Sequence, residues 1–314
     1  MENPRIVFLG TGEIAIPAFR FLIEEGFCPV ALVTQPDRPA GRRRELKPPP
    51  IKEVALAVGM TVLQPERVKE ESTLEAIEAL KPDLIVVMAY GQILPKRLIG
   101  MAPLGCVNLH ASLLPKYRGA ACIQAAIDAG DSVTGVTLMH VVPKLDAGDV
   151  ILAKETPIND DDTGGSLHDR LAELARDALK AGLPSLLDGT AASMSQESMG
   201  EISHISKLDR EDGRIDWSWS APRIERRLRA YDPWPGCYTT YADGAKTKRL
   251  KIFPAGVCAG FGEPGEVTIE GGQVRVACGE GLLVLGHVQA DGSRRMAAID
   301  WSRGWQGESV TRLD

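Results

Sequence analysis

Four short, almost entirely apolar runs alternate with helix-like segments in the first 140 residues, and this alternation constrains the fold more than any other feature. Strands that are buried on both faces of a parallel sheet have this composition. Residues 17–25 and 51–58, which lie between runs, have helical spacing. The pattern predicts an α/β fold with a doubly wound, mostly parallel sheet, whose ligands bind outside the carboxyl ends of the strands. The four runs are residues 6–9, 30–33, 84–88 and 136–139.

The texture of the sequence changes in its second half. A helical stripe that begins near Ser166 meets Gly182-Leu-Pro184, which predicts its end, and a polar connection follows. Beyond this connection, short strand-like runs are separated by glycine pairs, as in a small antiparallel barrel. We therefore predict an α/β catalytic domain over residues 1–188, a linker over 189–206 and a C-terminal OB-like β-barrel over 207–314.

Composition excludes several classes of protein. No apolar run approaches the roughly 20 residues that a membrane helix needs. The N-terminus enters a strand-like segment directly, without the basic start and cleavage site of a signal peptide. The six cysteines are scattered and form no CxxC pair, which favours reduced thiols over disulfides or a zinc site. We therefore expect a cytoplasmic protein that binds neither a membrane nor a metal.

A glycine motif after the first apolar run allows one alternative function. Gly10-Thr-Gly-Glu-Ile-Ala15 matches GxGxxA, and Asp37 stands about where a dinucleotide fold places its ribose-binding acid. This pattern would suit an NAD-dependent dehydrogenase. Asp37, however, lies beyond the predicted strand end, inside a proline-rich loop. The favoured interpretation is a tight strand-to-helix turn that needs glycine for a positive φ.

The segment Cys106-Val-Asn-Leu-His110 is more informative. In an extended chain, alternation places Asn108 and His110 on one face. An amide that donates a hydrogen bond, next to an imidazole that also handles a proton, suits a reaction that builds negative charge on a carbonyl oxygen. Taken alone, the pair could equally be a satisfied polar pair that closes a strand end.

Two neighbouring loops add context. Residues 111–119 combine apolar, backbone and basic elements, which suit an aromatic heterocycle with an acidic tail. Asp146 and Asp149 lie in a glycine turn after another strand, where aspartates are usually backbone caps. A carboxylate beside His110 would instead fix its tautomer and raise its pKa.

Together, three segments resemble the signature of formyltransferases that use 10-formyltetrahydrofolate: Asn108-Leu-His110, Ser112-Leu-Leu-Pro115 and Asp146-Ala-Gly-Asp149. The resemblance implies that Asn108, His110 and Asp146 are the catalytic trio, and it implies a folate co-substrate and no metal. It also implies contacts to the folate from residues in two segments: Ser112, Leu113, Leu114 and Pro115 in the loop, and Met88, Tyr90 and Gly91 around the motif Ala89-Tyr-Gly91.

Further stretches resemble the branch of this family that acts on tRNA: residues 33–41, 207–217 and 231–236. The implied reaction moves the formyl group onto the free amine of methionyl initiator tRNA by direct amine attack, for translation initiation. The alternatives are hydrolysis of the formyl-folate and transfer to a small amine. We expect a monomer whose partners are the folate and the tRNA.

A basic loop is the other feature that the tRNA-acting branch shares. The resemblance implies that it contacts the tRNA through Arg38, Arg42, Arg43, Arg44 and Lys47. The alternative is a solvated charge run. The net charge of −6 argues against a nucleic-acid partner, but residues 203–314 carry 16 Lys/Arg and 15 Asp/Glu. A local patch can bind phosphate on an acidic chain.

The sequence departs from the family pattern at two places near the predicted pocket. Cys122 stands where the family usually has proline, and Ile14 stands where it usually has an aromatic residue.

Overall fold

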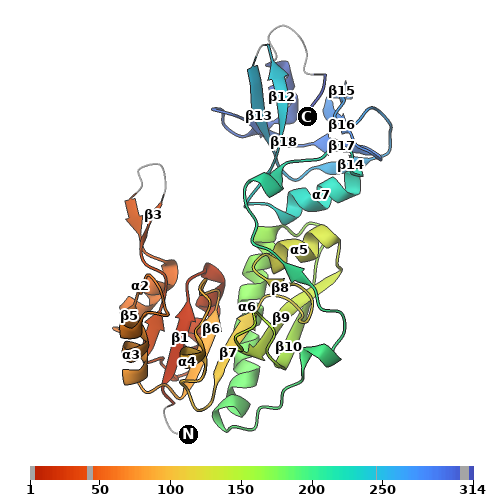
Figure 1. Ribbon diagram of the computed structural model, residues 1–314. Coiled ribbons are helices and arrows are strands. Elements are labelled where there is room, and N and C mark those ends of the chain that lie inside the picture. Colours follow the sequence, from red (N-terminus) through yellow and green to blue (C-terminus); the bar gives the residue numbers. More distant parts are fainter. Residues whose placement is uncertain (1–3, 41–44, 245, 305–310) are drawn as a thin grey trace. The chain divides into compact units, whose positions relative to one another are not determined.

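The computed structural model describes residues 4–40, 45–244, 246–304 and 311–314 (Figure 1). The chain forms two compact units. The first comprises Met1–Cys122, Val133–Pro157 and His168–Ile205, and the second comprises Ile123–Ser132, Ile158–Leu167 and Ser206–Asp314. The predicted linker up to residue 205 is thus grouped with the first unit, and the boundaries at 188 and 206 stay predictions.

A seven-stranded sheet forms the centre of the first unit, in the order β10-β9-β7-β6-β1-β2-β5. Neighbours from β5 to β7 in this order run parallel, while β9 and β10 are antiparallel. The predicted mostly parallel sheet is confirmed. The strands are β1 (Ile6–Gly10), β2 (Ala31–Val33), β5 (Thr61–Leu63), β6 (Leu84–Met88), β7 (Cys106–His110), β9 (Val133–His140) and β10 (Val150–Pro157).

Helices with one apolar face accompany this sheet. In α1, the residues at spacing i, i+1, i+3 and i+4 from Ala18 are buried, and Phe19 packs on Phe8 of β1 with ring centroids 5.0 Å apart. A proline in the first turn suits this helix, because no backbone partner for its nitrogen is needed there. The helices of this unit are α1 (Ile16–Glu24), α2 (Pro50–Ala57), α3 (Glu71–Ala79), α4 (Lys96–Ile99) and α6 (Gly164–Leu187), whose first turn is grouped with the second unit, with the 3-10 turns η1 (Glu13–Ala15) and η2 (Gln196–Ser198). The helix α5 (Cys122–Ala129) falls almost wholly in the second unit.

Two local expectations were wrong. Residues 136–139 belong to β9, which is buried along most of its length but pairs antiparallel to β7. Burial on both faces makes a strand apolar whatever its direction. The helix expected to end at Gly182-Leu-Pro184 continues to Leu187, because Leu183 and Leu186 are buried and anchor its last turn.

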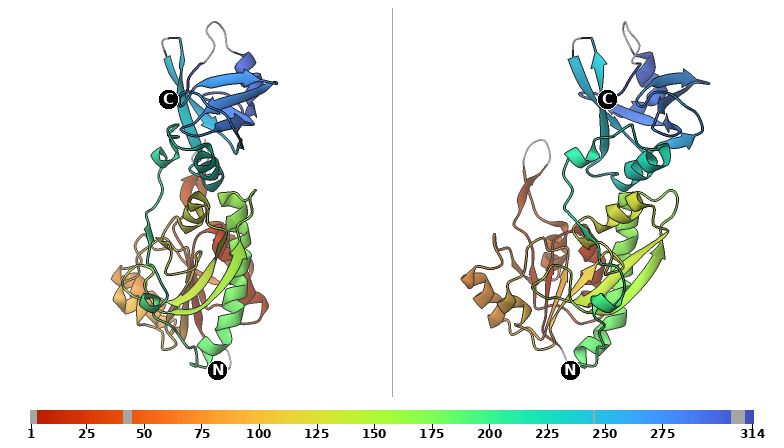
Figure 2. Two further views of the ribbon diagram at one scale, coloured as in Figure 1. Left: turned by 90° about the vertical axis from the view of Figure 1, so that its right-hand side faces the viewer. Right: turned by 45° about the vertical axis from the view of Figure 1, so that its right-hand side comes forward.

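The second unit contains two antiparallel four-stranded sheets, in the orders β12-β13-β18-β19 and β14-β17-β16-β15. Its strands can be followed in Figure 2. The predicted C-terminal domain of antiparallel strands is confirmed. Its strands are β12 (Cys237–Asp243), β13 (Lys246–Ile252), β14 (Gly256–Cys258), β15 (Val267–Glu270), β16 (Gln273–Ala277), β17 (Leu282–Leu285), β18 (His287–Ala290) and β19 (Met296–Ala297), and its further helical elements are η3 (Glu211–Gly213), α7 (Ala221–Ala230) and α8 (Ala298–Arg303).

Two strand pairs lie outside the main sheets. β3 (Arg38–Ala40) pairs antiparallel with β4 (Glu45–Lys47), and β8 (Arg118–Gly119) pairs parallel with β11 (His204–Ile205). The first pair builds a hairpin from the predicted basic loop. The second joins the loop after β7 to a segment more than 80 residues further along the chain.

Helices that could cross a membrane were sought over the described ranges. None there is both long enough and apolar enough.

The glycine motif at the end of β1 was expected to need glycine for a positive φ, and this expectation was wrong. Glycine is needed because neighbouring atoms leave no room for a side chain. Gly12 has φ −66°, and Gly10 has no positive φ either. A Cβ at Gly10 would lie 2.7 Å from a ring carbon of Phe8 and 3.1 Å from the carbonyl oxygen of Met88. Glycine is required here because the turn packs directly on two strands.

We therefore expect Gly10→Ala to destabilise the protein by about 1–3 kcal/mol, as overpacking does in a dense core. Gly100→Ala is the control, because its Cβ would meet nothing closer than 3.5 Å. Thermal melting checks this, and equal midpoints for the two variants would contradict it.

Candidate active site

The predicted polar pair lies on β7, near the middle of the sheet. Asn108 pairs with Val87 on one side and Met139 on the other, and His110 pairs with Thr137. Strand alternation places Asn108 and His110 on the same face of the sheet. The predicted strand is thus confirmed, and it ends at the imidazole.

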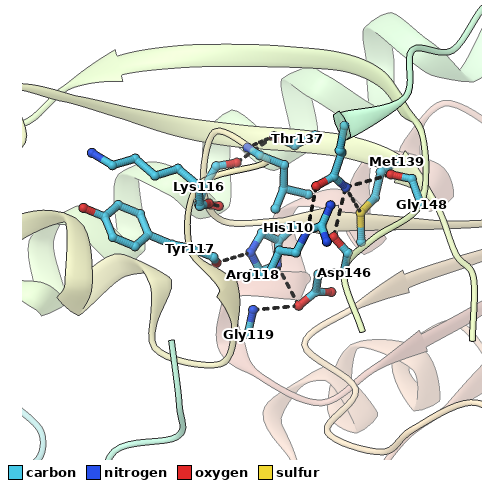
Figure 3. A network of polar contacts seen from close by, with 12 residues as sticks. His110, Lys116, Tyr117, Arg118, Gly119, Thr137, Met139, Asp146 and Gly148 are labelled. Atoms are coloured by element: carbon cyan, nitrogen blue, oxygen red, sulfur yellow. Dashed lines mark hydrogen bonds and ion pairs between the residues drawn. The ribbon is translucent and has the colours of Figure 1, made fainter. Parts of the chain in front are cut away.

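His110 is buried, and its two ring nitrogens lie toward Tyr117 and Asp146 (Figure 3). Its Nε2 lies 2.9 Å from the carbonyl oxygen of Tyr117, which can only accept, so Nε2 carries a proton. Its Nδ1 lies 3.8 Å from Oδ2 of Asp146. This second distance is too long for a direct hydrogen bond but close enough for electrostatic attraction. The Nδ1 proton therefore remains able to reach a ligand oxygen or a water molecule.

The surroundings of His110 favour its charged form. Burial lowers the pKa of His110. Cys122, the carboxylate of Asp146 and the carbonyl of Tyr117 raise the pKa, and together they outweigh the effect of burial. The net result is a pKa of about 9 instead of the ordinary 6.5. These contacts favour the imidazolium form, in which both ring nitrogens donate hydrogen bonds.

Asp146 is fixed by the backbone of the loop after β7. The N–H of Gly119 donates a hydrogen bond to Oδ2 of Asp146 at 2.9 Å. The same oxygen is the one nearest His110. The predicted carboxylate thus lies beside the predicted imidazole, as the orienting interpretation requires. Asp149 is exposed, and its backbone oxygen accepts from the N–H of His140.

Asn108 is half-buried, and no group within the described ranges forms a hydrogen bond with its amide. A half-buried amide without a partner, on the same strand face as His110, is available to a ligand. The structure brings the three residues of the predicted trio to one end of the sheet.

The predicted folate loop is rigid, and some of its polar groups are already used. The Ser112 hydroxyl donates to the carbonyl of Lys116 at 2.7 Å and is fully buried. Thr137 bridges the loop by accepting from the N–H of Leu114 and donating to the carbonyl of Ser112. Leu114 packs with Met139 and Val150 in a small core cluster. Leu113 is half-buried, so it is more accessible than its buried neighbours.

The second segment predicted to contact the folate, from Met88 to Gly91, turns sharply at the end of β6. Met88 is buried, and the ring of Tyr90 packs in the main core cluster, where its hydroxyl has no hydrogen-bond partner among the residues that the structure describes. Burial raises the pKa of Tyr90 to about 12. Its carbonyl accepts hydrogen bonds from Gln35 and Thr11. Only Gly91 of the three predicted residues is exposed, so this turn offers backbone more than side chains.

Unusual backbone conformations mark the same place. Non-glycine residues with positive φ are costly and gather at functional sites, where the surrounding structure holds them. Over the described ranges there are four: Lys81 (49°), Ala89 (48°), Tyr117 (60°) and Asp146 (46°). The last three lie in the turn and the two loops of the predicted site.

Exposed apolar side chains lie in these loops as well. Ile93 is 81% exposed two residues beyond Gly91, and Leu145 is 60% exposed directly before Asp146. Apolar surface with a few fixed polar groups is typical of a site for an aromatic ligand. The donor set and this surface fit a folate.

Several residues of the site carried no signal in the sequence. Gln196 and Ser203, in the predicted linker, form hydrogen bonds with the loops of Asp146 and Tyr117. Arg118 is 2% exposed and donates from Nε to Gln196. Single polar residues in a polar segment have no pattern that would distinguish them.

Asp37, the residue that would bind the ribose of a dinucleotide, already has partners within the protein. Lys52 forms an ion pair with Asp37 at 2.9 Å, and Gln64 donates to the same carboxylate at 2.6 Å. The hydrogen bonds from Gln64 and then Lys52 lower the pKa of Asp37. Asp37 thus fixes the base of the basic loop.

The predicted tRNA-binding residues are only partly visible. Arg38 and Lys47 face each other across the β3–β4 hairpin, and both are exposed. Arg38 also pairs with the exposed Glu66 at 2.8 Å. Arg42, Arg43 and Arg44 lie outside the described residues.

Comparison with known proteins identifies the family. Residues 4–183 match the formyl transferase family, and residues 207–306 match the formyl transferase C-terminal domain. The chain belongs to the formyl transferase family. Within it, the methionyl-tRNA formyltransferase of Akkermansia muciniphila is 50% identical over 93% of this chain and 94% of its own. That of Marinobacter nauticus is 44% identical over 96% of both chains.

Solved structures share the fold at low identity. The sugar 3N-formyl transferase WlaRD has a TM-score of 0.67 at 15% identity, over 94% of this chain and 100% of its own. HypX from Aquifex aeolicus in complex with tetrahydrofolic acid has a TM-score of 0.63 at 20% identity, over 99% of this chain. The alignment covers 51% of the HypX chain, so the present chain corresponds to about half of HypX.

Cys122, which stands where the family usually has proline, raises the pKa of His110. We expect Cys122→Ala to lower that pKa from about 9 toward the ordinary 6.5. NMR titration of labelled histidine checks this, with Cys28→Ala, an exposed cysteine, as control. An unchanged pKa of His110 would show that the thiol has no such effect.

Proposed function

We propose that this protein transfers the formyl group of 10-formyltetrahydrofolate to the free amino group of methionyl initiator tRNA, in the cytoplasm, for translation initiation. One observation supports this most. A chain half identical to a methionyl-tRNA formyltransferase over nearly its whole length brings Asn108, His110 and Asp146 together at one end of its sheet. The high identity to methionyl-tRNA formyltransferases over nearly the whole chain disfavours a hydrolase or a small-amine transferase.

The folate would be held by the loop at Ser112–Pro115 and by the turn from Met88 to Gly91. When bound, it supplies a formyl carbon that an amine can attack. The rigid loop offers the half-buried Leu113, and the turn offers backbone at Gly91. Fixed groups of this kind orient a ligand without losing further conformational freedom.

The attack needs a neutral amine, and a free α-amino group titrates near 7.7–8.0, so a useful fraction is neutral at pH 7. Asn108 would donate a hydrogen bond to the carbonyl oxygen as negative charge develops on it. The imidazolium of His110 would stabilise the same charge, since its pKa of about 9 keeps it protonated. Each such donor typically contributes about 10²–10³ in rate.

Proton transfer completes the reaction. His110 would deliver a proton toward the departing nitrogen and recover one from the attacking amine, directly or through water. The Asp146 carboxylate would hold the ring in orientation and favour its charged form.

The tRNA would be bound by the β3–β4 hairpin with Arg38, Arg42, Arg43, Arg44 and Lys47, and by the second unit as a tRNA-binding domain. Arginine pairs with phosphate through two parallel hydrogen bonds, which makes a short arginine cluster an effective phosphate site. We also propose that the protein acts as a monomer.

The direct test supplies the protein with charged initiator tRNA and 10-formyltetrahydrofolate labelled in the formyl group. Label should appear on the methionine amine. Label released as formate with or without tRNA would instead identify a hydrolase.

Asn108→Ala should lower kcat by about 10²–10³, because it removes one donor to the developing oxyanion. Glu75→Ala, a change at an exposed residue on α3 of the first unit, should leave kcat unchanged. Stopped-flow or quench measurements of formyl transfer give both values. Near-normal turnover in a folded Asn108→Ala protein would remove Asn108 from the mechanism.

Replacing Arg42, Arg43 and Arg44 with alanine should weaken tRNA binding and flatten its salt dependence, because fewer counterions are released from the tRNA. The control removes three other exposed charges of the first unit: Arg67, Lys69 and Lys96. The measurement is Kd for initiator tRNA over a salt series. Equal slopes for the two triple variants would identify the arginines as a solvated charge run.

A further inference from the structure

The segment from Met194 to Ile205, here called the strap, fell within the predicted linker, but it packs on the candidate active site. At its start, Met194 and Val150 exchange two backbone hydrogen bonds of 2.8 Å. At its end, β11 pairs with β8. Between these points it contacts both loops that fix His110.

Gln196 is the first of these contacts, and it is 1% exposed. Its Nε2 donates to the carbonyls of Asp146 at 2.9 Å and Gly148 at 2.7 Å. Its Oε1 accepts from Nε of the buried Arg118 at 2.9 Å. Both donors and the acceptor of one amide are thus used on the two loops. The loop residues that it contacts, Asp146, Gly148 and Arg118, are labelled in Figure 3. The buried amide of Gln196 therefore holds the Asp146 turn through two of the backbone carbonyls of that turn.

Ser203 provides the second contact. Its hydroxyl accepts from the N–H of Tyr117 at 2.8 Å, and its carbonyl accepts from the N–H of Arg118 at 2.9 Å. Tyr117 has a positive φ of 60°, a conformation that its surroundings must hold. The strap therefore fixes the residue whose carbonyl accepts from His110.

Gly119 shows how closely the strap approaches. It has φ +116°, and a Cβ there would lie 2.1 Å from the carbonyl oxygen of Ile205. The N–H of the same Gly119 holds the Asp146 carboxylate. Only glycine permits this contact.

We propose that Gln196 is a positioning residue for formyl transfer, which keeps the Asp146 carboxylate at the working distance from His110 without touching either substrate. This role rests on the proposed function. It requires that the loss of the two Nε2 donors moves the Asp146 turn, since two backbone carbonyls in a dry site would lose their partners. A displacement of about 1 Å at a reacting centre can cost on the order of 10²-fold in rate.

The test is Gln196→Glu in the full chain. Glutamate keeps an acceptor for Arg118 but replaces both donors with an oxygen that repels the two carbonyls. We expect kcat for formyl transfer to fall on the order of 10²-fold, with KM for both substrates close to wild type. Glu197→Gln, an exposed change on the neighbouring residue, should alter none of these.

Gln196→Met is the second variant, and it serves if Gln196→Glu does not fold, as judged by circular dichroism. It removes both Nε2 donors and the acceptor for Arg118 without adding a buried charge, and it should lower kcat with little change in either KM. Wild-type kcat in a folded variant of either kind, or a loss that lies wholly in KM, would overturn the positioning role. Failure of the wild-type protein to transfer label would instead overturn the proposed function, so the two failures are distinguishable.

Discussion

The candidate active site depends on how one imidazole is held. The hydrogen bond from His110 Nε2 to the carbonyl of Tyr117 fixes the ring on one side, and the Asp146 carboxylate attracts it on the other. Both partners sit on residues with positive φ, and such conformations persist only where the surrounding structure imposes them. The strap, the Gly119 contact and the Thr137 bridge all act on these two loops. The raised pKa of His110 follows from the resulting geometry, because the favourable contacts outweigh the effect of burial.

The sheet supplies the rigid base for this arrangement, and its main features could be predicted. Apolar runs identified β1, β2, β6 and part of β9, because strands buried on both faces consist mostly of apolar residues. The direction of β9 could not be predicted, since burial is the same for parallel and antiparallel neighbours. The glycines after β1 were expected to serve a positive φ, whereas Gly10 avoids a clash with Phe8. A clash of this kind depends on tertiary packing and is not visible in a sequence.

The site was partly predictable for a similar reason. Alternation along a strand placed Asn108 and His110 on one face, and the family resemblance supplied Asp146; the structure brings all three together. The sequence could not tell that the ring of Tyr90 turns into the core or that the hydroxyl of Ser112 is used within its own loop. Gln196 had no signal at all, because an isolated glutamine in a polar segment resembles its neighbours until the fold buries it.

The central claim is that Asn108 and the His110–Asp146 pair act as one unit on the developing oxyanion. A double-mutant cycle tests this most directly, with single-turnover formyl transfer to methionyl initiator tRNA measured for Asn108→Ala, Asp146→Ala and the double variant. Groups that act as a unit lose little more together than the more damaging change costs alone. We expect the double variant to transfer the formyl group at a rate close to that of the slower single variant. Losses that multiply fully would contradict it, because they would show that Asn108 and Asp146 contribute independently.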